Sequence, residues 1–90
     1  MAVRLITYDL SKEITSDDYA EILDYIKSHA WARLSESSYA IETTETPEAI
    51  YQELSKHLDT NDSLLVLTLT SPWDGRANKA VIDWLKQRLW

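Results

Sequence analysis

The sequence predicts an α+β fold of ferredoxin-like type, in which the order βαββαβ forms a four-stranded antiparallel sheet and an added C-terminal helix ends the chain. Four segments have the composition and alternation of strands, and two amphipathic helical stripes separate them in this order. In such a split βαβ arrangement both helices cover one face of the sheet. With 90 residues, 44% of them hydrophobic, we predict one domain over residues 1–90, made of a core at 1–70 and a C-terminal loop and helix at 71–90.

The first half of the chain supplies a strand, a helix and a hairpin. Residues 3–10 alternate in the manner of a strand that stops near Asp9, and the cluster at 15–18 has the polar, acidic character of a helix start. The short apolar segments 31–34 and 38–43 flank a polar turn and predict a hairpin. The core side of the helix is expected to be a stripe formed by Tyr19, Ile22, Leu23 and Ile26.

The second half supplies a helix, a strand and the terminal helix. Thr46 before Pro47 is typical of a helix start, and an apolar stripe follows as far as Leu58. Residues 63–70 are so uniformly aliphatic that we predict a central strand covered on both faces, and we expect Leu67→Asp to prevent folding. A break at 71–75 precedes the last amphipathic stripe, which is formed by Ala77, Ala80, Val81, Trp84, Leu85 and Leu89.

The face of the sheet opposite the two early helices needs a cover of its own. The terminal helix supplies part of that cover in this interpretation. A second copy of the chain, related by a two-fold axis, is the simplest source of the rest. The sequence therefore predicts a homodimer.

Composition and charge exclude several classes of function. The chain has no cysteine, which removes disulfides, thiol nucleophiles and cysteine-based zinc sites. The N-terminus lacks the pattern of a signal peptide, and the longest aliphatic run, 64–67, is far shorter than the roughly 20 residues of a membrane-spanning helix. We therefore expect a cytoplasmic protein with no membrane association.

The charge is unevenly distributed. The net charge of −6 argues against general electrostatic binding of nucleic acid. Residues 1–62 carry a net charge of −8, whereas residues 63–90 carry +2. Any surface that attracts anions should therefore lie near the C-terminus.

Asp9, at the end of the first predicted strand, is the most suggestive single residue. A carboxylate at a sheet edge near a two-fold axis is doubled by that axis, and two carboxylates with water molecules are suitable anchors for Mg²⁺ or Mn²⁺. The competing interpretation is that Asp9 only caps the turn that follows the strand. From spacing alone, the turn role is the commoner one.

Arg33 and Ser37 lie on either side of the predicted hairpin turn. An arginine near a hydroxyl is suited to hold a phosphate through charge-assisted hydrogen bonds, but Arg33 is equally placed to pair with Glu36 or Glu42 on the surface. No HExxH, GxGxxG or P-loop spacing occurs, which disfavours zinc hydrolysis and nucleotide binding through those motifs.

Two local patterns resemble a known family. Residues 7–10 read Thr-Tyr-Asp-Leu at the end of the first strand, and residues 33–39 combine an arginine, three residues, a serine, one residue and an aromatic. In this order they resemble the small ferredoxin-like protein of the CRISPR adaptation machinery, the dimeric partner of the integrase, and the related virulence-associated protein D toxins. A stand-alone branch of compact relatives is similar also at Trp31, at the turn 58–62 and at Trp73.

The resemblance extends to about Thr70 and has functional implications. It implies that Asp9 of each subunit binds the metal of a phosphodiesterase site that cuts RNA or DNA, with Arg33 and Ser37 as supporting residues of that catalytic site. The family's adaptation protein continues with a further strand, whereas residues 72–90 predict a helix here.

Two functional hypotheses follow. The leading one is a dimeric CRISPR-adaptation-like protein of a defence or mobile-element setting, with weak nuclease activity that depends on Mg²⁺ or Mn²⁺ at paired Asp9 residues. The alternative is a non-catalytic interaction or assembly module, such as a toxin–antitoxin component, that binds a protein partner through its sheet face and terminal helix.

Overall fold

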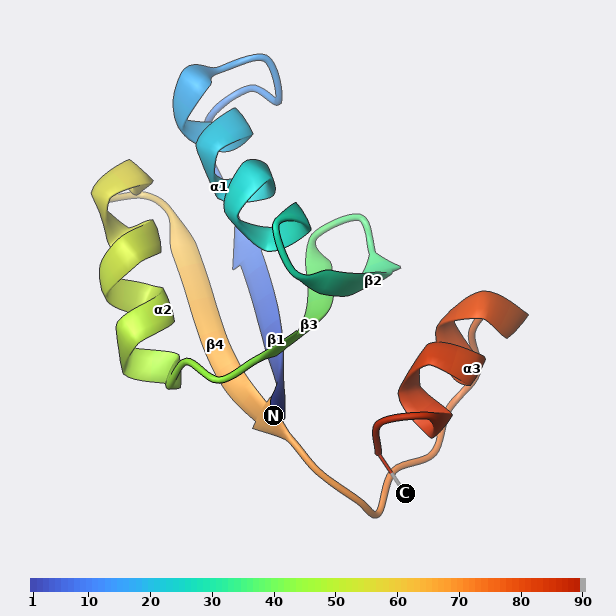
Figure 1. Cartoon of the computed structure of the whole chain (residues 1–90). Coiled ribbons are helices and arrows are strands. Elements are labelled where there is room, and N and C mark those ends of the chain that lie inside the picture. The colour runs from blue at the N-terminus through green and yellow to red at the C-terminus, as the bar shows by residue number, and fades with distance from the viewer. Residues whose placement is uncertain (90) are drawn as a thin grey trace.

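The computed structural model describes residues 1–89, so residue 90, the last of the predicted C-terminal segment, lies outside the described part (Figure 1). Within that range the chain forms a four-stranded antiparallel sheet, three α-helices and one 3-10 turn. The elements in chain order are β1 (Ala2–Asp9), α1 (Asp17–Lys27), β2 (Ala30–Ser35), β3 (Ser38–Thr43), α2 (Pro47–Leu54), η1 (Ser55–His57), β4 (Ser63–Leu69) and α3 (Lys79–Lys86).

Each helix begins at a polar side chain that caps its free backbone N–H groups. The Ser16 hydroxyl accepts from the N–H of Tyr19, and the Thr46 hydroxyl accepts from the N–H of Ala49, each at 3.1 Å. The Asn78 amide oxygen does the same for α3 at 3.0 Å. These caps explain why the helices start where they do, since an uncapped start leaves several N–H groups without a partner. The helix starts expected at 15–18 and at Thr46 are confirmed.

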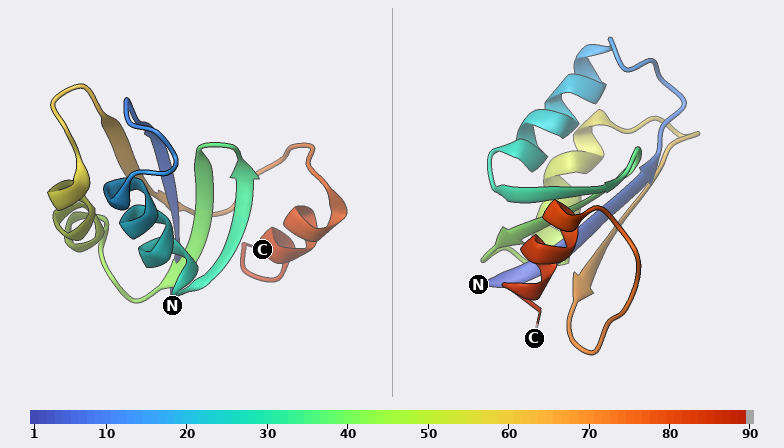
Figure 2. Two further views of the ribbon diagram at one scale, coloured as in Figure 1. Left: turned by 90° about the horizontal axis from the view of Figure 1, so that it is seen from above. Right: turned by 90° about the vertical axis from the view of Figure 1, so that its right-hand side faces the viewer.

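The sheet has the strand order β2-β3-β1-β4, and every neighbouring pair is antiparallel. Figure 2 shows α1 and α2 side by side along one face of the sheet, with α3 apart from them. The predicted α+β class, with four antiparallel strands and three helices in the described residues, is confirmed and is compatible with a ferredoxin-like fold.

The main core lies between the sheet and α1 and α2. Side chains two residues apart on a strand share a face, so one set of β1 residues meets the helices. The largest fully buried side chains all belong to this layer or to the helices that cover it; they are Ile6, Ile22, Ile26, Ile41, Ile50 and Leu54. Four come from the predicted helical stripes, which therefore do face the core.

The opposite face of the sheet is covered by α3 over part of its area. Val81, Leu85 and Leu89 pack there against Val3 and Ala40, and all five side chains are buried. The cover reaches Leu69 of β4 but leaves the other two leucines of that strand on the same face exposed. Leu65 is 62% exposed and Leu67 is 45% exposed.

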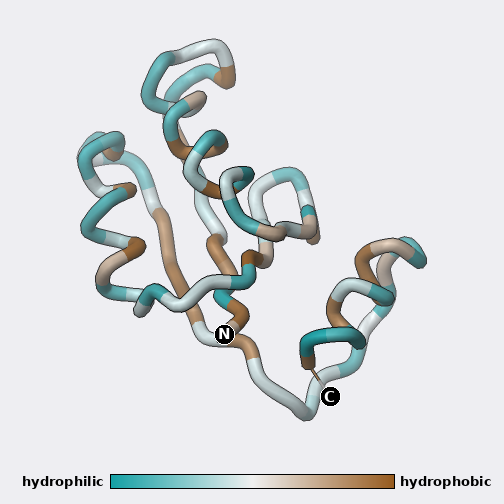
Figure 3. Tube along the Cα trace, in the orientation of Figure 1, coloured by the Kyte–Doolittle hydropathy of each residue, from teal (hydrophilic) through white to brown (hydrophobic). Residues whose placement is uncertain are grey.

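The predicted central position of the last strand is wrong, because β4 lies at an edge of the sheet. Its aliphatic run is apolar along nearly its whole length (Figure 3), yet only the side that faces the helices is buried, with Leu64 at 7% exposure. The expectation that Leu67→Asp prevents folding is therefore also wrong. Because Leu67 is half-exposed in a single copy of the chain, an aspartate at this position would remain in contact with water.

No helix within residues 1–89 has the length and apolar character needed to cross a membrane.

Candidate functional site

A shallow hollow lies at the end of the sheet where β1 finishes. Its volume is about 440 Å³, and it is lined by Tyr8, Asp9, Leu10, Tyr19, Glu36 and Ser37. The hollow therefore brings together the end of β1, the first turns of α1 and the β2–β3 turn. Asp9 and Ser37, which the sequence singled out separately, share its lining.

Asp9 occupies this end of the sheet because the β1–β4 pairing stops there. It stands opposite Ser63, the first residue of β4, and its side chain is exposed. Within residues 1–89 its carboxylate has no hydrogen-bond or ion-pair partner. The capping hydrogen bond expected in the alternative interpretation is therefore not present among residues 1–89. The carboxylate is available to a ligand.

The face on which Asp9 lies is set by strand alternation. Asp9, Thr7 and Leu5 follow one another at every second position of β1, so they share a face, and their partners on β4 are Ser63, Leu65 and Leu67. This is the face that α3 leaves partly uncovered. Asp9 therefore lies on the partly uncovered face, at the end of the sheet beyond the exposed leucines of the neighbouring strand.

Ser37 is held at the rim of the hollow by the hairpin turn. Its carbonyl accepts a hydrogen bond from the N–H of Tyr8 at 3.0 Å, which fixes the turn against the end of β1. Its hydroxyl has no partner within residues 1–89. Ser37 thus offers a free hydroxyl next to Asp9.

Arg33 braces this turn from β2. Its Nε donates to the Ser35 carbonyl at 3.2 Å, its Nη2 donates to the Glu36 carbonyl at 3.3 Å, and its guanidinium lies 5.8 Å from the centre of the Tyr39 ring. The expected surface pair with a glutamate carboxylate does not form, because the described contacts of Arg33 are to carbonyls and Glu42 pairs with Arg88. Arg33 does not line the hollow as Asp9 and Ser37 do.

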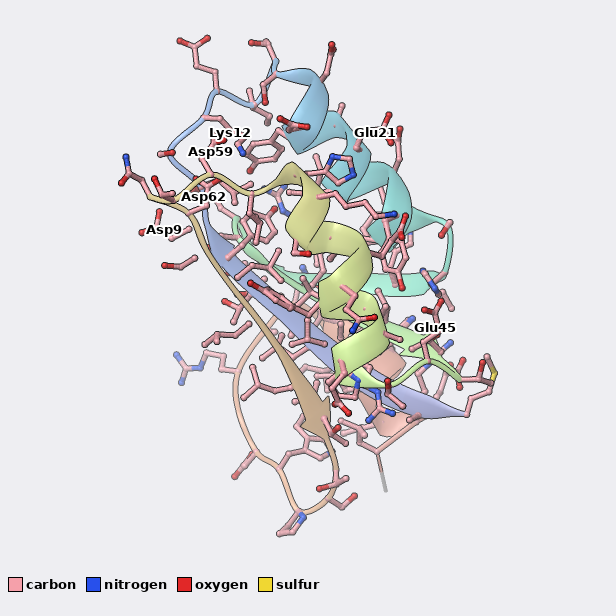
Figure 4. All side chains as sticks on the ribbon, turned by 90° about the vertical axis from the view of Figure 1, so that its left-hand side faces the viewer. Asp9, Lys12, Glu21, Glu45, Asp59 and Asp62 are labelled. Atoms are coloured by element: carbon pink, nitrogen blue, oxygen red, sulfur yellow. The ribbon has the colours of Figure 1, made fainter. Side chains whose placement is uncertain are left out.

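A second polar cluster, which the sequence did not reveal, lies at the same end of the sheet (Figure 4). Lys12 Nζ lies 2.7 Å from Asp62 Oδ2, 3.3 Å from Asp59 Oδ2 and 2.6 Å from the carbonyl oxygen of His57. Asp62 also accepts from the backbone N–H and the hydroxyl of Ser11, at 2.7 and 2.8 Å. The only signal in the sequence was the turn pattern at 58–62. That pattern predicts the turn but does not reveal that Asp62 pairs with Lys12, which lies 50 residues away.

This cluster joins the loop after β1 to the loop before β4. The Asp62 side chain has no exposed area and that of Lys12 is 9% exposed. The N–H of Asp59, the Lys12 ammonium and Ser11 all donate to Asp62 and hold the pKa of its carboxyl far below the ordinary range. Asp62 is therefore occupied by protein donors, whereas the Asp9 carboxylate has no partner within residues 1–89.

The donor set at Asp9 suits a hard divalent cation only in part. One chain contributes the free Asp9 carboxylate, and Glu36 lines the same hollow. Within residues 1–89, no three histidine or carboxylate side chains converge in a group able to hold a metal ion. A cation at Asp9 would need water molecules and carboxylates of a second copy as further ligands, which is the coordination that Mg²⁺ commonly takes.

The chain matches no protein-family model, and no curated protein is similar to it in sequence.

Proposed function

We propose that this chain is a ferredoxin-like protein that dimerises through its uncovered sheet face and cuts RNA or DNA phosphodiesters with Mg²⁺ or Mn²⁺ at paired Asp9 residues. The single observation that carries the proposal is the position of Asp9. Its carboxylate has no partner within residues 1–89 and lies on the same sheet face as the exposed Leu65 and Leu67 of the neighbouring strand. In the proposed dimer the two-fold axis runs along the strands, so that a second copy packed on this face brings the two Asp9 side chains together at the same end.

The dimer follows from the exposed leucines. A half- to two-thirds-exposed pair of leucines on a flat sheet face is costly in water, at about 25 cal/mol for each Å² of apolar surface. A self-complementary two-fold contact is the commonest way for a small protein to bury such a face. The resemblance at residues 7–10 and 33–39 to a family of dimers supports the same arrangement.

The chemistry divides among the residues at the hollow. A bound divalent cation would activate water and offset the charge that develops on the phosphate. Asp9 would anchor it, and the free Ser37 hydroxyl is placed to donate to a phosphate oxygen. Arg33 acts through the turn that it braces, so we assign it a positioning role rather than direct contact.

The test is cleavage of labelled single-stranded RNA, single-stranded DNA and duplex DNA in the presence of Mg²⁺ or Mn²⁺. Wild type should cut at least one substrate, and Asp9→Ala should lose roughly a hundredfold or more of the rate. Asp24→Ala is the matched control, because Asp24 is an exposed carboxylate on α1 with no side-chain partner in residues 1–89. Equal loss in the two variants, or cleavage that survives Asp9→Ala, refutes the assignment.

A second candidate function is a non-catalytic module that binds a protein partner, such as a toxin–antitoxin component. The edge position of β4 favours it, because an edge strand with exposed Leu65 and Leu67 can accept another strand or an apolar surface. The acidic charge of the whole chain also favours a protein over a polyanion as partner. A wild-type dimer that cuts none of the substrates supports this candidate.

A further inference from the structure

The C-terminal segment holds a second hollow, away from Asp9. It measures about 480 Å³ and lies between the loop after β4 and α3, lined by Trp73, Asp74, Gly75, Arg76, Ala77, Ile82, Lys86 and Leu89. This volume falls in the usual range for small-molecule sites. The two hollows lie far apart on the sheet. Val3, at the start of β1, packs against α3, and Asp9 lies six residues further along the strand, a distance of about 20 Å.

The wall of this hollow is a tryptophan held in a fixed position. Trp73 is half-buried against the α3 cluster, and its Nε1 donates to the Leu89 carbonyl at 2.7 Å. The indole is thus anchored by its polar edge, and Ala77 and Ile82 add apolar surface beside it. Such a site accommodates a flat ring, because an aromatic wall stacks on it without a rearrangement of the side chain.

The cations of this region divide into two kinds. Arg88 stacks on Trp84 at 4.0 Å and pairs with Glu42, and Lys79 pairs with Asp83 at 2.6 Å. The other two, Arg76 and Lys86, have no hydrogen bond, ion pair or ring contact in residues 1–89, and both line the hollow. The unpaired positive charge of the C-terminal segment is therefore concentrated at one aromatic site.

The carboxylate in the lining is partly occupied. Asp74 Oδ1 accepts from the N–H of Gly75 at 2.8 Å, which closes the turn. Among the described residues that line the hollow, two unpaired cations and one carboxylate give a net positive charge, on a protein whose total charge is −6. An anion is thus attracted to this hollow in preference to the rest of the acidic surface.

We propose that this hollow binds one nucleotide unit of a single-stranded nucleic acid, with the base against Trp73 and the phosphate between Arg76 and Lys86. A ring that carries a phosphate is the ligand that satisfies both halves of the site. A duplex is excluded as the preferred ligand because its bases are stacked and paired, and because a long polyanion meets the acidic residues of the first 62 positions. The inference rests on the proposed function only for the claim that nucleic acid is the substrate.

The test is binding without catalysis. A fluorescein-labelled oligo-adenylate RNA of about ten nucleotides is titrated with protein in EDTA and followed by fluorescence anisotropy. Arg76→Ala/Lys86→Ala should weaken binding by about tenfold or more, and AMP should compete better than adenosine or inorganic phosphate alone. A duplex of the same length should bind more weakly than the single strand.

The matched control is Lys27→Ala/Lys56→Ala, which removes the same charge at exposed positions outside the hollow. It should change the dissociation constant by less than about threefold. Equal weakening by both double variants reduces the effect to general electrostatics and overturns the proposal, as does an absence of wild-type binding at about 100 μM protein. If wild type does not cleave but Asp9→Ala still binds the oligonucleotide, the binding site is supported and the proposed nuclease activity is refuted. If wild type cleaves but does not bind at this hollow, the nuclease activity is supported and the binding site is refuted.

Discussion

Lys12 Nζ and Asp62 Oδ2 lie 2.7 Å apart and form the least exposed ion pair in residues 1–89. The pair ties the loop after β1 to the loop before β4, and both loops adjoin the end of the sheet that carries Asp9. Because the Asp62 side chain has no exposed area, loss of Lys12 would leave its charge without a cation and away from solvent. The pair therefore holds the two loops together.

We predict that Lys12→Met lowers the melting temperature by at least about 5 °C, because the Asp62 carboxylate then loses its cation. Lys56→Met is the matched control, since Lys56 pairs with Glu53 at the surface and both side chains are more than half exposed. That variant should shift the melting temperature by no more than about 3 °C. The melting temperatures are measured by thermal unfolding monitored with circular dichroism. Equal shifts in the two variants would show that the Lys12 pair contributes no more to stability than a surface pair.

The same cluster predicts acid sensitivity. The pKa of Asp62 is lowered in the folded chain, so this carboxylate stabilises the fold above the ordinary carboxyl pKa of 3.8, and the contribution is lost as the pH falls below that value toward the folded pKa. Urea unfolding at pH 7, 5, 4 and 3 measures the loss. Asp62→Asn should start from a lower stability at pH 7 and show a flatter decline below pH 4, and a decline as steep as that of wild type would place the acid sensitivity elsewhere.

The two faces of β4 should respond differently to charge. Leu67→Asp should remain folded and change the free energy of unfolding of the isolated chain by about 1 kcal/mol or less, because the side chain is 45% exposed. Leu64→Asp should cost about 3 kcal/mol or more, because that side chain is 7% exposed in the main core.

The same substitution tests the dimer. In the proposed dimer, each copy of Leu67→Asp would place a charge on the apolar face between the two copies. Sedimentation velocity should therefore find this variant folded and monomeric at concentrations where wild type sediments as a dimer. A dimer of unchanged affinity would show that this face is not the interface.

Arg33 should act on the hairpin turn that carries Ser37. Lysine lacks the forked geometry that lets one guanidinium meet two carbonyls, so Arg33→Lys should loosen the turn. We expect amide exchange at Tyr8, whose N–H donates to Ser37, to become roughly five- to tenfold faster. Arg76→Lys, which changes an arginine without a partner in residues 1–89, should leave this exchange rate unchanged; identical exchange in wild type and Arg33→Lys would remove the positioning role.

Tyr25 should titrate late. Burial, and secondarily the nearby Glu45 carboxylate, raise the pKa of Tyr25 to about 12. Since the unfolded chain ionises near 10, stability that is complete below pH 10 declines between pH 10 and 12. Absorbance at alkaline pH should lose a component that titrates near pH 12 in Tyr25→Phe. Tyr51→Phe should retain that component, since the parent side chain is 47% exposed; loss of a component near pH 10 in Tyr25→Phe would contradict the assignment.

The candidate site could be predicted from the sequence only in pieces. Asp9 stood out because a strand pattern ends there, and Ser37 because a turn pattern surrounds it. That the two line one hollow depends on the pairing of β1 with β3, a contact between segments about 30 residues apart. The partners of Arg33 were missed because they are carbonyl oxygens, which every residue carries and no sequence pattern marks.

The elements and their order follow from local sequence, because helix caps and apolar spacing act over a few residues. Ser16 and Thr46 start helices whose stripes face the core. Which strand lies at an edge and which loops meet depend instead on contacts between distant segments. The run at 64–67 is equally aliphatic in a central or an edge strand, and whether Leu67 is covered depends on how far α3 reaches across the sheet. The Lys12–Asp62 pair likewise exists only once β1 and β4 have paired, since local spacing carries no information about a partner 50 residues away.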